Sequence, residues 1–496
     1  MRLLVLACTL SSVLLLARAE VDAPITQHWN GGFLGEACID ITQELHSWTM
    51  TLTFDQPLSS LTAFQADVAE SKDGGKVYIL HNKDWNKDEH VGDRLCVGFQ
   101  GAINGDVVPK VTASIQGMDG GSTGVATQPP STGQTSGPVV TSTSGARLQI
   151  EGNHFTFGGQ KVFLSGGNLP WISYAYDFGD GQWGSRKSQM EDQFKKLHEA
   201  GGNSMRLWIH IQGETSPAFD SNGYVTAPDH QGTFINDFKD MLNLAQSYDL
   251  LVFPTLWNAA VDQDTSHHLD GLVVDGQKLQ SYIDKVLTPL ATAVKGHPAL
   301  GAWDIMNEPE GMINPDVGNS ERCFDATAMK NSGAGWAGRK YGFQDIIRFI
   351  NWQAAAIKNV DSGFLVTVGS WNPKSNTDRM GFVDHYSDDC LVKGGKSNGK
   401  IDFYQFHSYS YNGQFDNVSP FSNSAGDYGT GKPIVVGEFW EQDGGGMNIN
   451  QLFDYVYNHG YAGAWSWDLV GHGDNQRGGI SHIRGYNNNG AISINV

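Results

Sequence analysis

The chain has 496 residues, with 33 lysines and arginines against 53 aspartates and glutamates, so its formal net charge is −20. This balance excludes proteins that hold nucleic acid or an anionic membrane through clustered cations. The 61 glycines exceed the usual share of ~7%, but 24 Phe, 16 Tyr and 14 Trp exclude a disordered chain. The length predicts two or three domains.

The first 19 residues have the pattern of a secretory signal peptide. Arg2 gives a positive start, an apolar run follows, and Ala17-Arg18-Ala19 places small residues at the cleavage position. The apolar run is shorter than the ~20 residues that a membrane span requires. We therefore expect a secreted, extracellular protein with no membrane partner.

Residues 119–146 separate two parts of different pattern. This segment consists mainly of Gly, Ser, Thr and Pro, with one charged and no aromatic residue, and is predicted to be a linker. Residues 20–118 precede it and alternate apolar and polar side chains, as in 48–54 and 76–80. Alternation at period two predicts a small antiparallel β-sandwich.

Five cysteines are present, and Cys8 lies in the signal segment. The other four, Cys38, Cys96, Cys323 and Cys390, suggest disulfides in a secreted protein, with three possible pairings. The linker separates the first two from the last two, which favours Cys38 with Cys96 and Cys323 with Cys390. Neither pair has the spacing of a zinc site, and no metal is expected.

Residues 147–496 alternate strand and helix patterns. The strand candidates lie near 162–164, 205–208, 250–253, 300–305, 364–368, 402–406, 434–436 and 462–465. Eight strands over about 350 residues predict an α/β fold, a closed (β/α)8 TIM barrel, with an open doubly wound sheet as the alternative.

Helical faces lie between these strands, near 235–242, 346–354 and 452–456. One further helix is expected to begin at Ser188, as an N-cap with Glu191 three residues on, and to end at Gly201. Its apolar face consists of Met190, Phe194 and Leu197.

Two glutamates directly follow predicted strands. Glu308 lies in Asn307-Glu308-Pro309 after the fourth strand, and Glu438 lies in Gly437-Glu438-Phe439 after the seventh. In a parallel barrel both side chains meet at the carboxyl ends of the strands. A pair of carboxylates, one of them protonated, is what cleavage of a glycosidic bond requires.

These two motifs resemble the acid/base and nucleophile signatures of glycoside hydrolase family 5. Four further positions resemble that family's active site: Arg206, the pair His407 and Tyr409, and Trp467, with Trp465 as the alternative to Trp467. Where the family often has a His after the third strand, this chain has Trp257-Asn258.

The resemblance implies a retaining mechanism without a cofactor or metal. Glu308 would act as acid and then as base, and Glu438 as the nucleophile. Asn307 would hold the 2-hydroxyl group of the sugar, Arg206 and Tyr409 would orient Glu438, and His407 would support Glu308 or the substrate.

Segments 164–171, 176–180 and 205–210 resemble the endo-β-1,4-mannanases of molluscs within that family. This resemblance covers about residues 147–496 and implies hydrolysis of internal bonds in mannan, glucomannan or galactomannan. An endo-β-1,4-glucanase on the same scaffold is the alternative, and an inactive polysaccharide-binding protein is a further one.

Tryptophans are candidates for a sugar-binding groove, because pyranose rings stack on indole. The candidates are Trp171, Trp183, Trp371, Trp440 and Trp467. Each has barrel core as its alternative, but Trp440 and Trp467 lie at strand ends, which favours the groove.

The first domain resembles a family 2 carbohydrate-binding module. Trp29 and Trp85 match two of its exposed sugar-binding aromatics, Phe64 occupies the third position, and Trp48 matches a buried one. The resemblance implies binding to insoluble polysaccharide such as cellulose, with core positions for Trp29 and Trp85 as the alternative. A disulfide between Cys38 and Cys96 departs from the family pattern. We expect a monomer whose only partners are polysaccharides.

Overall fold

The computed structural model describes residues 21–117 and 146–496, apart from residues 30, 64–65, 84–85, 88–90, 92–93, 104, 106, 262 and 339–340. The chain forms two compact units, Met1–Thr132 and Gly133–Val496. The division falls inside the predicted linker, which, like the predicted signal peptide, lies outside the described residues except for Ala146. Within the described ranges, every helix is too short or too polar to cross a bilayer.

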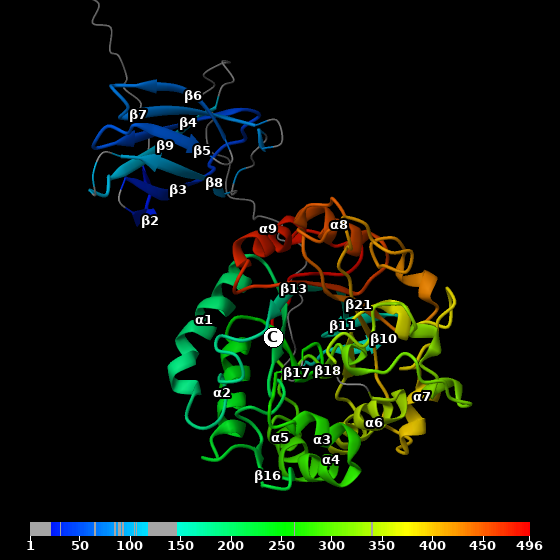
Figure 1. The fold of residues 1–496 in the computed structure, drawn as a ribbon. Coiled ribbons are helices and arrows are strands. Elements are labelled where there is room, and N and C mark those ends of the chain that lie inside the picture. Colours follow the sequence, from blue (N-terminus) through cyan, green and yellow to red (C-terminus); the bar gives the residue numbers. More distant parts are fainter. Residues whose placement is uncertain are drawn as a thin grey trace, which may run out of the picture. The chain divides into compact units, whose positions relative to one another are not determined.

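The first unit is an antiparallel β-sandwich, as predicted (Figure 1). One sheet has the order β1 (Val21–Asp22), β9 (Val111–Gly117), β4 (Trp48–Phe54), β7 (Val77–Asn82) and β6 (Ala66–Lys72). The other has the order β2 (Ile25–Trp29), β3 (Gly32–Asp40), β8 (Arg94–Ala102) and β5 (Ser60–Ala63).

Alternating side chains of β4 form the centre of the sandwich core. Trp48, Met50, Leu52 and Phe54 are all buried, while the residues between them face outward. The Trp48 indole Nε1 donates to the backbone oxygen of Asn86 at 2.6 Å, so its polar atom is satisfied inside the core. The prediction that Trp48 is buried is confirmed.

A disulfide joins neighbouring strands of the second sheet. Cys38 in β3 and Cys96 in β8 are directly paired across the ladder, and their sulfurs are bonded. The Cys323–Cys390 disulfide in the second unit is also formed, so both predicted pairings are confirmed.

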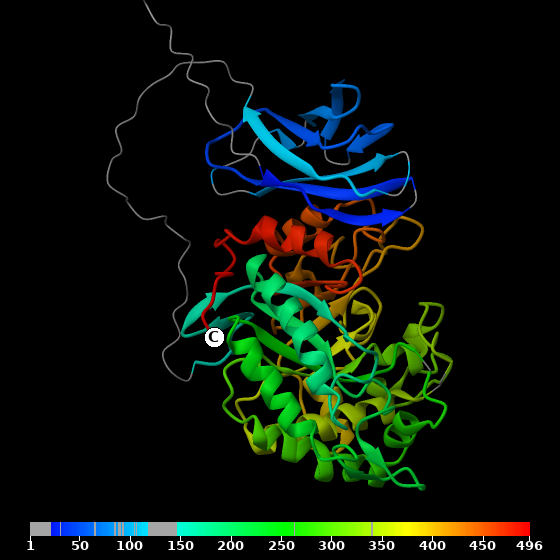
Figure 2. The ribbon, with the colours of Figure 1, turned by 90° about the vertical axis from the view of Figure 1, so that its left-hand side faces the viewer.

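The second unit is a closed barrel of parallel strands surrounded by helices (Figures 1 and 2). The strands are β13 (Leu164–Leu169), β14 (Ser204–Trp208), β17 (Leu251–Asn258), β18 (Trp303–Asn307), β19 (Val366–Ser370), β20 (Tyr404–His407), β21 (Ile434–Glu438) and β22 (Gly463–Ser466). Because β13 pairs with both β14 and β22, the sheet closes, which excludes the open doubly wound alternative.

The helices pack their apolar faces on the outside of the strands. They are α1 (Trp183–Glu199), α2 (Phe234–Gln246), α3 (His268–Val274), α4 (Gly276–Tyr282), α5 (Thr288–Ala293), α6 (Phe343–Val360), α7 (Asp388–Leu391), α8 (Ile449–Asn458) and α9 (Gly473–Ile483). Short strands outside the barrel wall are β10 (Gln149–Glu151), β11 (His154–Phe157), β12 (Gln160–Val162), β15 (Ala218–Phe219) and β16 (Val225–Ala227).

Helix α1 begins six positions before the predicted start, with Gln182 and not Ser188 as its N-cap. Ser188 lies within the helix, and the predicted N-cap is wrong. Trp183 supplies the reason, because its buried ring stacks on Phe178 at 5.4 Å and its Nε1 donates to Asp240 at 2.7 Å. Tertiary packing therefore adds a first turn that the local cap signal does not contain. The predicted end holds, since Gly201 has φ 83° directly after the helix.

The two units have separate hydrophobic cores, so they are expected to lose stability independently. Replacing Cys38 and Cys96 by serine releases a cross-link between residues 58 positions apart, which should cost the sandwich about 2–4 kcal/mol. In calorimetry of the full chain, the transition of the sandwich should fall and that of the barrel should not move. The Cys323→Ser/Cys390→Ser pair is the matched control and should lower only the barrel transition; a joint shift in either variant would contradict separate cores.

Candidate active site

A cavity of about 500 Å³ opens at the carboxyl ends of the barrel strands. Its lining residues are Trp171, Tyr174, Trp208, Asn258, Ala260, Val261, Gln263, Asn307, Glu308, Trp336, Trp371, Tyr409, Glu438 and Trp467. Both predicted catalytic glutamates therefore face one cavity, among predicted and unpredicted aromatic side chains. Arg206 and His407 lie buried beneath it and contact the two glutamates.

Glu308 is placed by a sharp change of backbone direction at the end of β18. Asn307 is the last residue of the strand, and Glu308 follows in the left-handed region, with φ 47° and ψ 57°. Its backbone N–H donates to the Gly369 oxygen of β19 at 2.6 Å, which holds this conformation. A non-glycine residue in this region is uncommon and is found where a site requires a particular direction.

Arg206 of β14 is the centre of the polar layer inside the barrel. Its side chain has no exposed surface, and its Nε donates to Asp304 at 2.7 Å. Nη1 donates to Glu438 at 2.7 Å, and Nη2 donates to Asn307 at 2.8 Å. The guanidinium thus compensates two buried carboxylates. A buried charge without such a partner would strongly destabilise the fold.

A glycine gives Arg206 the space that it occupies. A Cβ atom on Gly369 would lie 2.3 Å from Nη2 of Arg206, closer than any real contact. Any side chain at residue 369 would displace the guanidinium from its contacts with Glu438 and Asn307.

Glu438 ends β21 and accepts two hydrogen bonds. Arg206 donates to Oε1 at 2.7 Å and the Tyr409 hydroxyl donates to Oε2 at 2.8 Å. Both oxygens are therefore fixed in direction, and the cation and the neutral donor both favour the ionised form of the carboxylate. This geometry matches the orienting roles expected for Arg206 and Tyr409.

His407 contacts Glu308, and its surroundings indicate which nitrogen bears the proton. Burial lowers the pKa of His407 well below its usual value, with the Arg206 charge adding to the effect, so the ring is neutral. Its Nε2 lies 3.4 Å from Oε1 of Gln405, which can only accept, so the proton belongs on Nε2. Its Nδ1, 2.9 Å from Oε1 of Glu308, is then an acceptor, and this contact is satisfied when Glu308 is protonated.

The two glutamates differ in how strongly they hold a proton. Burial raises the pKa of Glu308 well above its usual value, and the charges of Glu438 and Glu310 raise it further. Burial also raises the pKa of Glu438, but Arg206 and Tyr409 act in the opposite direction. Glu308 is therefore the acid of the pair and Glu438 the carboxylate.

Glu308, His407 and Glu438 each present one ligand atom, and these atoms lie within 4.8 Å of one another. Three such side chains can hold a metal ion, but Arg206 already supplies positive charge to Glu438 at 2.7 Å. In the sandwich, Glu36 lies near Cys38 and Cys96, whose sulfurs are bonded to each other and therefore are not thiolate ligands.

Aromatic side chains form two walls of the cavity. On one side Trp208 lies 6.4 Å from Trp171 and 5.5 Å from Trp467, ring centre to ring centre. On the other side Trp336 and Trp371 lie 5.2 Å apart. The predicted groove residues Trp171, Trp371 and Trp467 thus line the cavity.

Three other tryptophans lie elsewhere. Trp465 is buried at the closed end of the barrel and donates to Ser204 at 2.9 Å, so Trp467 is the one at the cavity. Trp440 packs on His472 at 4.7 Å, and Trp183 stacks within the core, and neither lines the cavity.

Several site residues were missed by the sequence reading. They are Asp304, Gln405, Trp208 and Trp336. Asn258 accepts from Asn307 at 2.9 Å and stands where the family often has a His. A signal did exist for Asp304, because a charged residue inside an otherwise apolar strand indicates a polar layer within the barrel.

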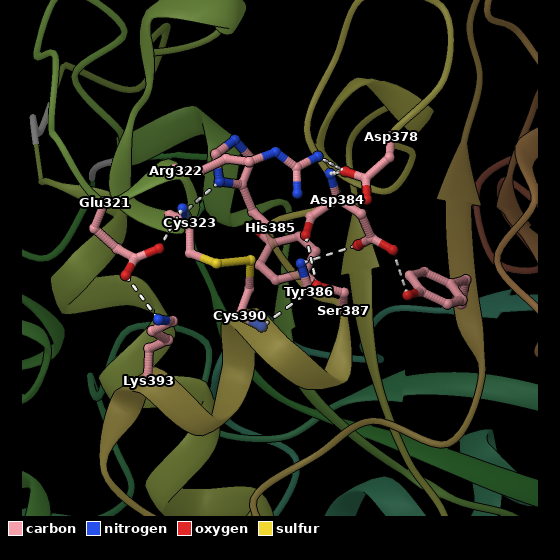
Figure 3. The surroundings of a disulfide bond; sticks show 11 residues. Glu321, Arg322, Cys323, Asp378, Asp384, His385, Tyr386, Ser387, Cys390 and Lys393 are labelled. Carbon is pink, nitrogen blue, oxygen red and sulfur yellow. Dashed lines mark hydrogen bonds and ion pairs between the residues drawn. A yellow bond between two sulfur atoms is a disulfide. The ribbon is translucent and has the colours of Figure 1, made fainter.

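A disulfide clasp joins the loop that carries Trp336 to α7, the helix that follows the loop that carries Trp371. We define the β18 loop as residues 309–342 and the β19 loop as residues 371–387. Figure 3 shows the clasp, in which Cys323 of the β18 loop bonds Cys390 of α7, and His385 Nδ1 contacts the Cys323 oxygen at 2.9 Å. An Arg322–Asp378 ion pair links the two loops again. The β18 loop is therefore tied covalently to the helix that follows the β19 loop, and the ion pair links the two loops directly.

The predicted binding residues of the sandwich cannot be placed in the same way. Phe64 and Trp85 lie outside the described residues, and Trp29 is described only as the last backbone position of β2. Their roles stay predictions.

Comparison with family models gives two matches. The model described as cellulase, glycosyl hydrolase family 5, matches residues 157–473. The model described as cellulose binding domain matches residues 19–120. The two resemblances found in the sequence are thereby confirmed, one for each unit.

Individual relatives match the barrel. A β-1,4-mannanase structure from the sea hare Aplysia kurodai is 66% identical, covers 71% of this chain and 100% of that chain, and has a TM-score of 0.70. The β-mannanase structure from the mussel Mytilus edulis is 48% identical, covers 70% and 99%, and has a TM-score of 0.68. A mannan endo-1,4-β-mannosidase from Cryptopygus antarcticus is 41% identical over 362 residues, which is 70% of this chain and 94% of the relative.

The Arg206 interactions predict a large stability effect. Arg206→Met leaves Asp304 and Glu438 buried without a cation and should lower the free energy of unfolding of the barrel by about 3–5 kcal/mol, measured by urea denaturation. Glu438→Gln is the matched control, because it removes one carboxylate and leaves Arg206 paired with Asp304, and its loss should be much smaller. Equal losses would show that the guanidinium does not hold the layer together.

Proposed function

The chain belongs to glycosyl hydrolase family 5, and from that membership we propose that it is an endo-β-1,4-mannanase acting with retention of configuration. The observation that carries the chemistry is the buried pair Glu308 and Glu438, with oxygens within 4.8 Å and with unequal hydrogen-bond partners. Retaining enzymes hold their two carboxyl groups about 5–5.5 Å apart, whereas inverting enzymes need more room for a water molecule.

In the first step a glycosyl-enzyme intermediate forms. The Glu308 proton passes to the glycosidic oxygen as the bond from that oxygen to the anomeric carbon breaks. A Glu438 oxygen attacks the same carbon from the opposite face and forms the new bond. Arg206 and Tyr409 keep the Glu438 carboxylate aimed while its charge is lost.

In the second step water releases the sugar. Glu308, now ionised, takes a proton from a water molecule, whose oxygen bonds to the anomeric carbon as the Glu438 ester bond breaks. The Asn307 amide is fixed by Arg206 and Asn258, which leaves it oriented for the 2-hydroxyl group of the sugar. Both carboxyl groups return to their starting states.

The substrate assignment rests on the relatives. The sea hare and mussel structures are named β-1,4-mannanase and β-mannanase, and both cover about 70% of this chain. Aromatic side chains on both sides of the carboxylates support binding of sugars on both sides of the cleaved bond, as internal cleavage requires. The family description also names cellulases, which makes an endo-β-1,4-glucanase the competing function.

The first unit is proposed to hold the enzyme on insoluble polysaccharide. Its match to a cellulose binding domain supports this, and a tethered module raises the local concentration of the barrel at the surface that it binds. Secretion is proposed on the first 19 residues together with two disulfides, which persist in oxidising compartments.

Substitution of the carboxylates tests the catalytic proposal. Glu438→Gln and Glu308→Gln should each lower kcat on soluble mannan by roughly 10³-fold or more, because each removes a group that makes or breaks a bond. The wild-type protein should release short oligosaccharides from mannan far faster than from carboxymethylcellulose, with the β-anomer appearing first by NMR.

Three results would contradict this proposal. Full activity of Glu438→Gln would remove it as nucleophile, first appearance of the α-anomer would exclude retention, and faster cleavage of carboxymethylcellulose would favour the glucanase. Glu441→Gln is a control, since this carboxylate follows β21 by three residues but does not line the cavity.

Removal of the module tests its contribution. A chain lacking residues 20–146 should keep its activity on soluble mannan but lose it severalfold on mannan embedded in cellulose, because only the second substrate offers a surface to bind. Product release from both substrates measures the ratio. An equal loss on the two substrates would argue against a targeting role.

A further inference from the structure

Glu310 is a buried carboxylate that the mechanism above does not use. It lies two residues after the acid Glu308, in the short turn η3 (Pro309–Met312), and has no exposed surface. Among the described residues no lysine, arginine or histidine pairs with it. A buried carboxylate without a cation is costly, so its hydrogen bonds must compensate it.

The side chain of Glu310 accepts three hydrogen bonds from the β19 loop. The Trp371 backbone N–H donates to Oε2 at 3.1 Å, and the hydroxyls of Ser375 and Tyr386 donate to Oε1 at 2.5 and 2.8 Å. Tyr386 belongs to the segment drawn beside the disulfide clasp in Figure 3. The carboxylate therefore holds the loop at its first residue and near its end.

The backbone of Glu310 acts on the other tryptophan. Its carbonyl oxygen accepts from the Gly335 N–H at 2.9 Å, directly before Trp336. Trp336 in turn donates from Nε1 to the Ala260 oxygen at 2.9 Å. Glu310 thus bonds the backbone N–H of Trp371 and the backbone N–H of Gly335, the residue before Trp336.

We propose that Glu310 is a positioning residue that fixes Trp336 and Trp371 beside the catalytic acid, so that both rings form one preset binding surface for the polysaccharide. This proposal rests on the proposed function, because it assigns sugar binding to the two rings. Trp336 is 42% exposed, so its position over the cavity depends on backbone contacts such as the one to Glu310 and on its own hydrogen bond to Ala260.

Glu310 also acts electrostatically on the acid. Its charge raises the pKa of Glu308, as does that of Glu438, while Arg206 lowers it, and the facing His407 is neutral. Replacing the carboxylate by an amide keeps the shape and removes the charge. The pKa of Glu308 should then fall, and because Glu308 must be protonated to act, the alkaline limb of kcat/KM should move to lower pH.

The test compares Glu310→Gln, Trp371→Ala and the double variant in the full-length chain, with mannohexaose as substrate. Glu310→Gln should raise KM about five- to tenfold with a smaller change in kcat, the size expected when one ring contact is misplaced. The double variant should be little worse than Trp371→Ala alone, because the Glu310 side chain acts through Trp371, whereas Glu310→Gln keeps the carbonyl contact beside Trp336. Only the variants of Glu310 should shift the alkaline limb.

Controls keep the result interpretable if Glu310→Gln folds poorly. Tyr386→Phe removes one donor to Glu310 and should raise KM in the same direction by less. Asp402→Asn is a matched control, because Asp402 accepts from the Val366 N–H at 2.7 Å at the opposite end of β19, and it should leave KM unchanged.

The proposal is overturned if Glu310→Gln and Tyr386→Phe change only the melting temperature, or if the effects of Glu310→Gln and Trp371→Ala on KM multiply. An alkaline limb that stays in place would contradict only the electrostatic effect of Glu310 on Glu308. If the wild-type chain does not cleave mannohexaose, the proposed function has failed, whereas normal wild-type cleavage with unaffected variants rejects the role of Glu310 alone.

Discussion

The buried guanidinium of Arg206 is the interaction on which the site depends. It lies inside the barrel, pairs with Asp304 and Glu438, and orients Asn307, so two strands other than its own, β18 and β21, are joined at one cation. Burying a guanidinium costs its hydration free energy, and this cost is offset only when its N–H donors find acceptors inside the protein. The strand register and the absence of a side chain at Gly369 both serve that requirement. The nucleophile is therefore oriented by the same contacts that stabilise the barrel.

Much of this arrangement can be predicted from the sequence, because its signals are local. Most barrel strands contain apolar residues in sequence, Glu308 directly follows β18 and Glu438 ends β21, so topology alone brings the pair together. The cysteine pairs followed from the division of the chain at the linker. Where a feature depends on distant partners, prediction failed. The start of α1 is set by Trp183 against Asp240, and the alignment of Asn258 with Asn307 has no local pattern.

The tryptophans of the groove also divide into those with a local sequence signal and those placed by distant contacts. Trp171 and Trp467 follow strands and were recognised as candidates, whereas Trp336 lies deep in a loop of more than thirty residues whose path is set by contacts with other segments. Trp440 has a favourable sequence position but turns toward His472. Strand-end position thus predicts direction well for polar residues at the top of the barrel. It predicts less for aromatic residues, whose neighbours decide between groove and core.

The disulfide clasp has a consequence for how the protein is prepared. Cys323 and Cys390 lie outside the barrel strands, and the closed sheet and its core do not need their bond to form. A chain made in a reducing cytosol can therefore reach a folded barrel with a correct polar layer while its β18 loop lacks its covalent tie and keeps only non-covalent contacts. Such material would pass tests of solubility and secondary structure and still bind polysaccharide weakly. Low activity in a bacterial preparation would then report the redox state of one loop rather than the quality of the catalytic centre.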